Sequence, residues 1–268
     1  MKKFSFILAT LVCGVSFASA DFLSISGGVG IEQQKIDGYV KSGNTINYFN
    51  NSSAETDGNI NSGNLGLEDK NNPYVWVKLI NPIPVIPNIK FQYTRYSSTG
   101  HSNYIAGNVK IFNDANIPTA ITDADTKMDI NSYDLTFFYE FHPVFADIEA
   151  GAGFDYWSGK TTITGTAGGL HKTWLDSSWS VVLPYLYGHI ETMQIFGFSA
   201  LGTLKWAKAG DNHHYDYLGA LKYTIDVPGP VNPFVKVGYR YKEAYGVDGS
   251  NITKLRYKGF FAEIGVKF

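Results

Sequence analysis

The sequence predicts an all-β protein, a closed antiparallel transmembrane β-barrel of about ten strands. Three observations support this fold. Apolar and polar residues alternate along many segments, the connections between these segments alternate in length, and the C-terminal strand ends in an aromatic residue. Alternation at every second position is the signature of a strand whose two faces meet different surroundings. In a transmembrane barrel these are lipid and an enclosed lumen.

The first twenty residues have the three-part layout of a secretory signal peptide. Two lysines precede an apolar stretch at 4–12, and the small residues at 18–20 form a cleavage site. The apolar stretch is too short for a spanning helix. The alternatives are a retained anchor and a lipoprotein acylated on Cys13, but a valine precedes Cys13 where a lipoprotein signal needs a small residue. The sequence therefore predicts a signal peptide at 1–20 and a barrel at 21–268.

Cleavage after residue 20 would remove two lysines and the only cysteine, leaving 248 residues with 20 basic and 24 acidic side chains. Without cysteine the mature chain can form neither a disulfide nor a zinc–thiolate site. The near-neutral balance gives no sign of nucleic-acid binding. Aromatic residues make up 15% of the chain, and membrane barrels use such residues as girdles at the two interfaces.

Four of the predicted strands are less regular than the others. Apolar residues alternate with serine and glycine over 23–31, and with polar residues over 89–94. The segments 72–80 and 180–188 are apolar on both faces. Pro184 interrupts the second of them, and the sequence predicts a bulge there.

The remaining six strands alternate cleanly. They cover 129–141, 147–158, 195–207, 214–225, 232–244 and 260–268. The last strand has one apolar face, which consists of Phe260, Ala262, Ile264, Val266 and Phe268. With the four irregular segments this makes ten strands, an even number, so both termini are expected on the periplasmic side.

The connections between the strands are predicted to alternate in length. Those assigned to the outer end are 39–71, 99–128, 159–179, 208–213 and 245–253. Those assigned to the periplasmic end are 81–88, 142–146, 189–194 and 226–232. Short periplasmic turns opposite longer outer loops are typical of transmembrane barrels. A soluble secreted barrel would show the same alternation, but the signal peptide, the loop lengths and the aromatic C-terminus favour the membrane. The Asn-rich loop 39–71 is expected to be mobile or to fold back over the barrel mouth.

The mature start, Asp21-Phe22-Leu23 followed by Gly27-Gly28-Val29-Gly30, resembles the outer-membrane β-barrel family with a Gly-Gly-x-Gly-type signature near its N-terminus. Further short similarities occur at 147–159, 183–187 and 238–241. The resemblance implies a barrel in the cell outer membrane and no agreed activity. The alternate apolar residues that end at Phe268 look like the signal read by the barrel-assembly machinery.

The predicted lumen face carries charges of both signs. The candidate lumen-lining residues are Lys90, Asp134, Glu140, Glu149, Asp155, Lys205, Asp216, Lys222, Lys236, Arg240 and Glu263, with Asp147, Lys242 and Lys267 on the same face. Ionisable groups at membrane depth must face water or one another. They predict either the lining of a narrow pore or a network that fills a tight interior, and the mixed signs favour the network.

His213, His214 and Asp216 lie at the fourth predicted outer loop. Such a group could hold a metal or act in hydrolysis, but histidines in an exposed loop are usually just solvated. An outer-membrane protease of the omptin type would need an acidic dyad and a His–Asp pair, and no such set can be aligned. The sequence therefore predicts no enzyme, no metal site and no cofactor.

The expected function is that of an integral outer-membrane barrel, either structural or a narrow conduit for small solutes. The alternative is a surface-exposed binding or adhesion barrel that acts through its long loops. The expected partners are outer-membrane lipid, the barrel-assembly machinery and small solutes, without nucleic acid, and a monomer is expected.

Overall fold

The computed structural model describes residues 24–50, 61–107, 109–111, 115–117 and 119–268. The predicted signal peptide, and the part of the first outer connection at 51–60, lie outside these ranges. No helix in the described part of the chain has the length and apolar character needed to cross a bilayer.

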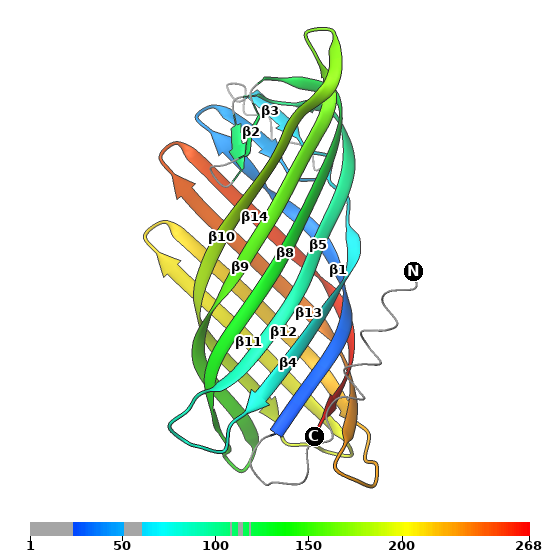
Figure 1. Cartoon of the computed structure of the whole chain (residues 1–268), viewed down its shortest axis with the longest axis vertical. Coiled ribbons are helices and arrows are strands. Elements are labelled where there is room, and N and C mark those ends of the chain that lie inside the picture. Colours follow the sequence, from blue (N-terminus) through cyan, green and yellow to red (C-terminus); the bar gives the residue numbers. More distant parts are fainter. Residues whose placement is uncertain (1–23, 51–60, 108, 112–114, 118) are drawn as a thin grey trace.

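Ten long antiparallel strands close into a ring (Figure 1). They are β1 (Ser24–Ser42), β4 (Lys70–Ile80), β5 (Asn88–Ile105), β8 (Ile121–Phe141), β9 (Ala146–Ala167), β10 (Leu170–Thr192), β11 (Phe198–Ala209), β12 (Asn212–Thr224), β13 (Asn232–Asp248) and β14 (Asn251–Lys267). Each strand pairs with the next, and β14 returns to β1 along a seam from Ser26↔Lys267 to Ser42↔Asn251. The predicted fold class, a closed antiparallel transmembrane β-barrel of ten strands, is confirmed.

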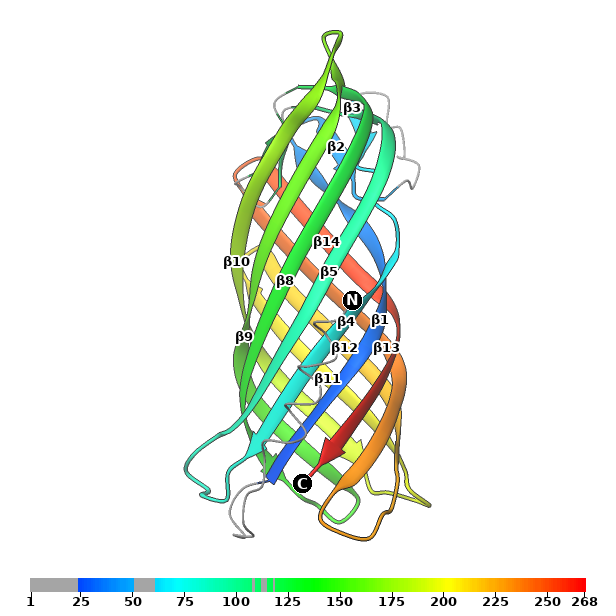
Figure 2. The same cartoon turned by 45° about the vertical axis from the view of Figure 1, so that its right-hand side comes forward.

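Both ends of the described chain lie at one end of the barrel, here called the terminal end (Figures 1 and 2). The connections 81–87, 142–145, 193–197 and 225–231 lie at this end. The opposite, distal end carries the long connections 43–69 and 106–120 and three two-residue turns at 168–169, 210–211 and 249–250.

The strands run further toward the distal end than the sequence predicts. Most of the predicted outer loops 159–179, 208–213 and 245–253 is strand, and the predicted loops 39–71 and 99–128 begin and end as strand. The sequence shows no alternation of apolar and polar residues in these segments, because the outward-facing residues are polar there. The turns carry two-residue hairpin signals nevertheless: Gly168, Gly169, Gly210 and Gly249 all have the positive φ that such turns require.

Four short strands lie near the distal end. They are β2 (Thr45–Tyr48), β3 (Asn61–Asn64), β6 (Val109–Ile111) and β7 (Ala115–Ile117). β4 pairs with β1 only as far as Gln34, and β2 pairs with the same edge of β1 further toward the distal end, from Tyr39 to Ser42. The β6–β7 hairpin approaches β1 and β14 on one side and β10 on the other, so it crosses the interior of the barrel.

Pro184 causes no bulge in β10, contrary to the sequence prediction. It pairs with Phe154 in an unbroken ladder, and the register shift between β9 and β10 lies at Thr173/Leu175 instead. Proline has no N–H, so this ladder is intact only because the Pro184 nitrogen faces away from β9. Pairing of β10 with β11 starts at Leu186, which places that nitrogen on a side without a partner strand.

An apolar belt surrounds the outside of the barrel next to the terminal end. It includes the exposed side chains of Ile31, Phe91, Tyr133, Phe137, Tyr139, Phe154, Tyr156, Val182, Leu186, Ile190, Phe198, Leu204, Trp206, Tyr217, Leu221, Tyr223, Val235, Val237, Tyr239, Phe260 and Ile264. A transmembrane barrel turns such a surface to lipid, with aromatic residues at its borders.

On β5, β8 and β9 the belt ends at three neighbouring tyrosines. Tyr93 pairs with Tyr133, and Tyr133 with Tyr156. Beyond them the outward residues are polar and charged, such as Arg95, Asn131, Asp129, Ser158 and Lys160. We call the parts of β5, β8, β9 and β10 beyond the belt, at 95–105, 121–131, 158–167 and 170–180, the distal extension.

The distal extension encloses an apolar core, here called the distal core. Its buried members are Ile36, Val40, Phe49, Leu65, Leu67, Tyr96, Ile105, Ile111, Ile117, Ile121, Ala124, Met128, Ile130, Trp157, Ile163, Leu175, Trp179, Ala244, Leu255 and Tyr257. Tyr96 on β5 reaches both Tyr257 on β14 and Trp157 on β9, with ring centroids 4.5 and 6.0 Å apart. Phe49 and Leu65 are fully buried, so the described parts of the first outer connection that contain them are packed over the mouth.

Substitution of Ile264, at the middle of the belt on β14, tests the lipid-facing surface. Ile264→Arg should lower the free energy of unfolding by about 2–4 kcal/mol, because an arginine near the bilayer midplane has no partner. The measurement is urea unfolding of the protein in phospholipid vesicles. Lys258→Arg, on the same face of the same strand but beyond the belt, is the control and should change little. Equal effects of the two substitutions would contradict the assignment of the belt to lipid.

Candidate functional site

The interior of the barrel has three levels. The distal core fills the distal part, a layer of buried charged residues crosses the middle, and a polar cavity opens at the terminal end. Inward positions alternate with belt positions on every strand, and this places the charged side chains inside.

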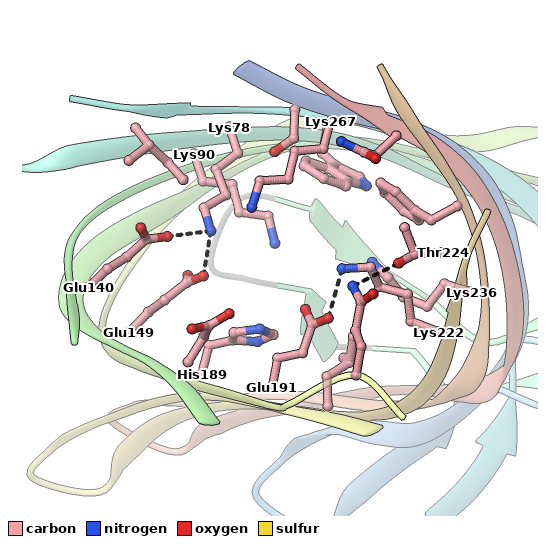
Figure 3. A pocket seen from close by; sticks show the side chains of 18 of the residues that line it. Lys78, Lys90, Glu140, Glu149, His189, Glu191, Lys222, Thr224, Lys236 and Lys267 are labelled. Atoms are coloured by element: carbon pink, nitrogen blue, oxygen red, sulfur yellow. Dashed lines mark hydrogen bonds and ion pairs between the residues drawn. The ribbon is translucent and has the colours of Figure 1, made fainter. Parts of the chain in front are cut away.

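The terminal cavity has a volume of about 370 Å3 (Figure 3). It is lined by Ser26, Trp76, Lys78, Ile80, Lys90, Glu140, His142, Asp147, Glu149, Tyr187, His189, Glu191, Gln194, Leu201, Lys222, Thr224, Asn232, Phe234, Lys236 and Lys267. A cavity of this size is large enough for a small molecule.

Most charges in the terminal cavity are paired. Lys78 lies between Glu140 and Glu149, at 2.7 and 2.5 Å from their carboxylate oxygens. Lys222 contacts Glu191 at 2.7 Å. These pairs join β4 to β8 and β9, and β12 to β10, so they connect strands that are not neighbours in the sheet.

At the inner end of the cavity, Lys236 forms an ion pair with Glu263 at 2.6 Å. The Tyr74 hydroxyl donates a hydrogen bond to the same carboxylate. The rings of Trp76 and Phe234 lie close by and are stacked at 6.3 Å. The Lys236 ammonium lies 5.2 Å from the centre of the Trp76 ring, in cation–π contact.

Two lysines of the cavity have no such partner. Lys90 and Lys267 form no ion pair with any residue that the structure describes, although every other lysine of the cavity does. Lys90 lies over the Trp76 ring at 5.3 Å. In Figure 3 the side chains of Lys78, Lys90 and Lys267 reach into the cavity from the same wall.

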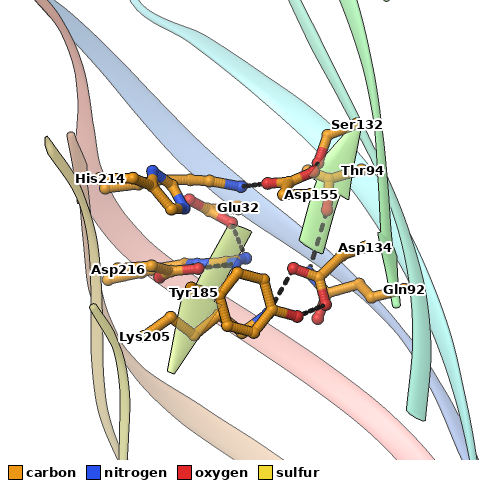
Figure 4. A network of polar contacts seen from close by, with 12 residues as sticks. Glu32, Gln92, Thr94, Ser132, Asp134, Asp155, Tyr185, Lys205, His214 and Asp216 are labelled. Carbon is orange, nitrogen blue, oxygen red and sulfur yellow. Dashed lines mark hydrogen bonds and ion pairs between the residues drawn. The ribbon is translucent and has the colours of Figure 1, made fainter. Parts of the chain in front are cut away.

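The central charge layer consists of Glu32, Asp134, Asp155, Lys205, Asp216, Arg240 and Lys242, and all seven are buried (Figure 4). Asp155 on β9 accepts hydrogen bonds from Lys242 on β13 at 2.6 Å, from Ser132 at 2.7 Å and from the Trp157 indole at 2.7 Å. Both carboxylate oxygens are therefore satisfied, as a buried charge requires.

Two further pairs complete the central charge layer. Arg240 donates two hydrogen bonds to Asp216, at 2.8 and 2.6 Å, and reaches Glu32 on β1 at 3.4 Å. A two-bond arginine–carboxylate contact is both strong and directional. Lys205 on β11 contacts Asp134 on β8 at 2.6 Å, and Asp134 also accepts a hydrogen bond from Tyr185.

These contacts close the middle of the barrel. The charged side chains of the central charge layer are at most 5% exposed, and each pair spans strands that are not neighbours in the sheet, apart from the adjacent pair Asp216 and Arg240. The distal core lies directly beyond them. Within the described chain, the terminal cavity is thus separated from the distal end by two packed levels.

A second hollow, here called the notch, opens sideways near the distal end, with a volume of about 580 Å3. It exists because β11 and β12 turn at 210–211 while β10 continues on one side and the β13–β14 hairpin rises on the other. Its walls are 180–184 of β10, 207–209 of β11, 212–214 of β12, and 244–248 with Asn251 and Thr253.

All eleven sequence-predicted lumen residues face the interior. Lys90, Glu140, Glu149, Lys222 and Lys236 line the terminal cavity. Glu263 lies below it, and Asp134, Asp155, Lys205, Asp216 and Arg240 belong to the central charge layer. A role of these residues in lining a conduit for solutes stays a prediction.

The sequence reasoning missed Glu32, Lys78, His189 and Glu191. Glu32 follows directly on the first predicted strand, and Lys78 lies in a segment that was apolar on both faces. His189 and Glu191 were assigned to a turn, whereas β10 continues to Thr192. Extending the alternation by a few residues at the strand ends would have found all but Lys78.

His213, His214 and Asp216 are not an exposed loop cluster, because β12 begins at Asn212. His214 and Asp216 face the interior and are 2% and 3% exposed. His213 points outward and lies 2.8 Å from Glu243. The three side chains therefore do not converge, and no group of three His, Cys, Asp or Glu within the described ranges is arranged to hold a metal ion.

No protein-family model matches the sequence, and no curated protein matches it. The solved structures similar to this chain include the translocator domain of the autotransporter NalP from Neisseria meningitidis (11% identity, TM-score 0.44, covering 99% of this chain and 94% of that one). They also include Ail, the attachment invasion locus protein of Yersinia pestis (8%, 0.34, 93% and 100%), and the outer-membrane protease OmpT from Escherichia coli (10%, 0.36, 95% and 99%). At these identities and TM-scores nothing about function follows, and the predicted resemblance to the Gly-Gly-x-Gly family stays a prediction.

Removal of Arg240 tests the central charge layer. Arg240→Met would leave Asp216 and Glu32 buried without a cation and should lower the free energy of unfolding by about 3–5 kcal/mol. The double variant Arg240→Met with Asp216→Leu, which also removes one of the stranded carboxylates, should recover part of this loss. Urea unfolding in phospholipid vesicles measures both. A loss for Arg240→Met no greater than that for Lys160→Met, at an exposed pair with Asp176, would contradict the layer's role.

Proposed function

We propose that this barrel spans the outer membrane of a Gram-negative bacterium, with the terminal end in the periplasm, and that it acts as a binding protein at the cell surface. The secretory signal in the sequence and the apolar belt support the location. The observation that supports binding is the distal extension. It rises beyond the belt on four strands and has a packed core of its own, and spanning a bilayer requires neither.

The filled interior supports binding over conduction. A conduit needs a continuous polar path, and ten strands leave little room once side chains point inward. Here the central charge layer and the distal core occupy that room. The apolar contacts of Tyr96, Trp157 and Tyr257 across the barrel make the extension rigid. A rigid surface binds with a smaller loss of conformational freedom than a loop does.

The free edge of β10 beside the notch is the best binding surface near the distal end. It runs from the belt residue Val182 into the distal extension at Ser180 and Ser178. No strand in the described part of the chain pairs with β10 on this side above Leu186. Since the Pro184 nitrogen faces this side, the N–H groups of Val182, Ser180 and Ser178 do as well, because residues alternate along a strand. An edge with unpaired N–H and C=O groups is a template for another strand.

The partner that fits this edge is an extended polypeptide segment, which would add to the sheet where β11 ends. Its backbone would pair with β10, and alternate side chains would enter the notch beside Val181 and Leu183. A second copy in the same membrane fits less well. Its own β10 would run in the same direction, from the distal to the terminal end, and two tilted strands would cross rather than pair.

We further propose that the protein is a monomer without enzymatic activity and that the face ending at Phe268 is read by the barrel-assembly machinery. The separation of His213 from His214 and Asp216 supports the absence of enzymatic activity. The belt residues Phe260 and Ile264 on β14 support the second, since they alternate up to the aromatic C-terminus.

A gated conduit is the second candidate function. The terminal cavity and the notch approach the central charge layer from opposite sides. His214 borders the notch, and Arg240 borders a small hollow on the side of the layer that faces the terminal cavity. Rearrangement of this one layer would connect the two. In the arrangement described, the layer is closed.

Substitution of Ser180 tests the edge of β10. Ser180→Pro removes an N–H from the free side and leaves the ladder with β9 intact, so binding of an extended peptide should fall at least tenfold, from a lost hydrogen bond of about 1 kcal/mol and the obstruction by the ring. The probes are peptides selected from a random ten-residue display library against the protein in lipid nanodiscs. Their affinities for both proteins would be measured by fluorescence anisotropy.

Ser180→Ala is the matched control, because it changes the same side chain and keeps the N–H. It should bind each peptide within about twofold of the unmodified protein. Equal affinity of the Pro and Ala variants, with both barrels folded, would exclude strand addition at this edge. Failure to select any peptide would count against the binding function itself.

Conductance of the double variant Asp134→Ala with Lys205→Ala separates the two candidate functions. This change removes one cross-lumen pair without leaving a lone charge. For a gated conduit, discrete current steps should occur in planar lipid bilayers, frequent for the variant and occasional for the unmodified protein. For a binding protein whose charge layer stays closed, the unmodified protein should be silent. Steps in the unmodified protein would contradict the first proposal.

A further inference from the structure

We propose that the terminal cavity binds a phosphate group, either as inorganic phosphate or on a small phosphomonoester. This site lies at the opposite end of the barrel from the surface proposed for binding and does not depend on that function. The observations that carry it are two lysines without counter-charges, Lys90 and Lys267, the Trp76 ring beside Lys90, and a cavity of suitable size that opens at the terminal end.

The two unpaired lysines are the first observation. Lys90 and Lys267 project into one cavity without a carboxylate within ion-pair distance, so far as the structure describes the chain. Lys90 is partly buried inside the cavity and Lys267 is exposed at its mouth, so an anion in the cavity would meet two cations that have no counter-charge of their own. Elsewhere in the interior, acidic residues neutralise the cations, as Asp155 does for Lys242. The exception at Lys90 and Lys267 therefore marks a place for an anion.

The acids of the cavity cannot neutralise these lysines without losing their own partners. Asp147, at the exposed mouth, contacts His142 at 2.8 Å. Glu140 and Glu149 both contact Lys78, and Tyr187 donates a further hydrogen bond to Glu149 at 2.7 Å. Glu191 is held by Lys222 and by the Ser199 hydroxyl. These contacts hold the carboxylates away from Lys90, so the cation site is already organised before an anion enters.

The aromatic wall beside the lysines is the second observation. Lys90 and Lys236 lie over the ring of Trp76, at 5.3 and 5.2 Å from its centre. Trp76 is 7% exposed, and its buried indole N–H has no hydrogen-bond partner in the described chain. The ring fixes the Lys90 stem and offers an apolar surface next to the charge. This combination suits a phosphate attached to a small organic group.

The size and the position of the cavity agree with such a ligand. A volume of about 370 Å3 accommodates a phosphate with a small sugar or glycerol moiety. The cavity opens at the terminal end, between His142, Asp147, Gln194 and Asn232. A ligand would therefore enter from the aqueous side that the barrel termini face, or from the headgroups of the adjoining lipid leaflet.

Ligand-dependent stability measures this site directly. The folded protein in phosphatidylcholine nanodiscs, at low ionic strength, should unfold at higher urea concentration when inorganic phosphate or glycerol 3-phosphate is added, since a ligand that binds only the folded state stabilises it. Lys90→Met should lose at least nine-tenths of this effect. Without phosphate the same variant should be no less stable than the unmodified protein, because it removes an uncompensated charge.

Lys267→Met is a second variant, at the cavity mouth, and should also lose most of the effect. Lys208→Met, which removes a lysine at the notch, is the control and should respond to phosphate as the unmodified protein does. Stabilisation by short-chain phosphatidic acid, but not by the soluble phosphates, would support the site with a lipid headgroup as the source. Equal stabilisation of all variants, or none of the unmodified protein by any of the three probes, would overturn the proposal.

Discussion

The pairing of β1 with β14 is the interaction on which the rest of the structure depends. In hydrocarbon every backbone N–H and C=O must find a partner within the protein, so a sheet that spans the bilayer cannot keep an open edge. The seam from Ser26↔Lys267 to Ser42↔Asn251 closes the ring, and closure divides the side chains into an outer and an inner set. The belt, the buried charges and the terminal cavity all follow from this division. A shift of β14 by one residue along the seam would turn Glu263 into lipid and Phe260 inward.

The closed ring leaves a narrow interior, and its three levels are filled in three different ways. Where the wall stands in lipid, the interior contains ion pairs such as Asp216 with Arg240, because inward charges must neutralise one another. Where the wall rises beyond the belt, apolar side chains fill the interior and polar side chains face outward, as in a soluble β-barrel. In the described part of the chain, the main open spaces are the terminal cavity and the notch. The chemistry that remains available to a ligand is therefore at the two ends, at the β10 edge and in the terminal cavity.

The sequence predicts the part of the fold in which the two faces differ. Over 129–141 and 232–244 the alternation is clean, since lipid and lumen demand opposite residue types, and the inward charges at Asp134 and Arg240 could be placed from it. The prediction failed where that contrast ends. In the distal extension the outward residues are polar and the inward residues are both polar and apolar. The two faces therefore differ too little in residue type to predict a strand, and 159–179 was predicted as a loop. Residue pairs across the lumen, such as Lys242 with Asp155, could not be predicted, because partners from strands far apart in sequence depend on the tilt of the whole barrel.

A disulfide across the seam tests closure most directly. Lys41 faces Ile252 near the distal end of the seam, and the mature chain is expected to contain no other cysteine. Directly opposed residues of antiparallel strands lie within the Cα distance that a disulfide tolerates. The variant Lys41→Cys with Ile252→Cys should therefore form an intramolecular disulfide on mild oxidation of the folded protein, which a gel shift after heating in the absence of reductant would detect. The off-register pair Lys41→Cys with Lys254→Cys should not. No disulfide in the first variant, or equal disulfide formation in both, would contradict a barrel closed by β1 and β14.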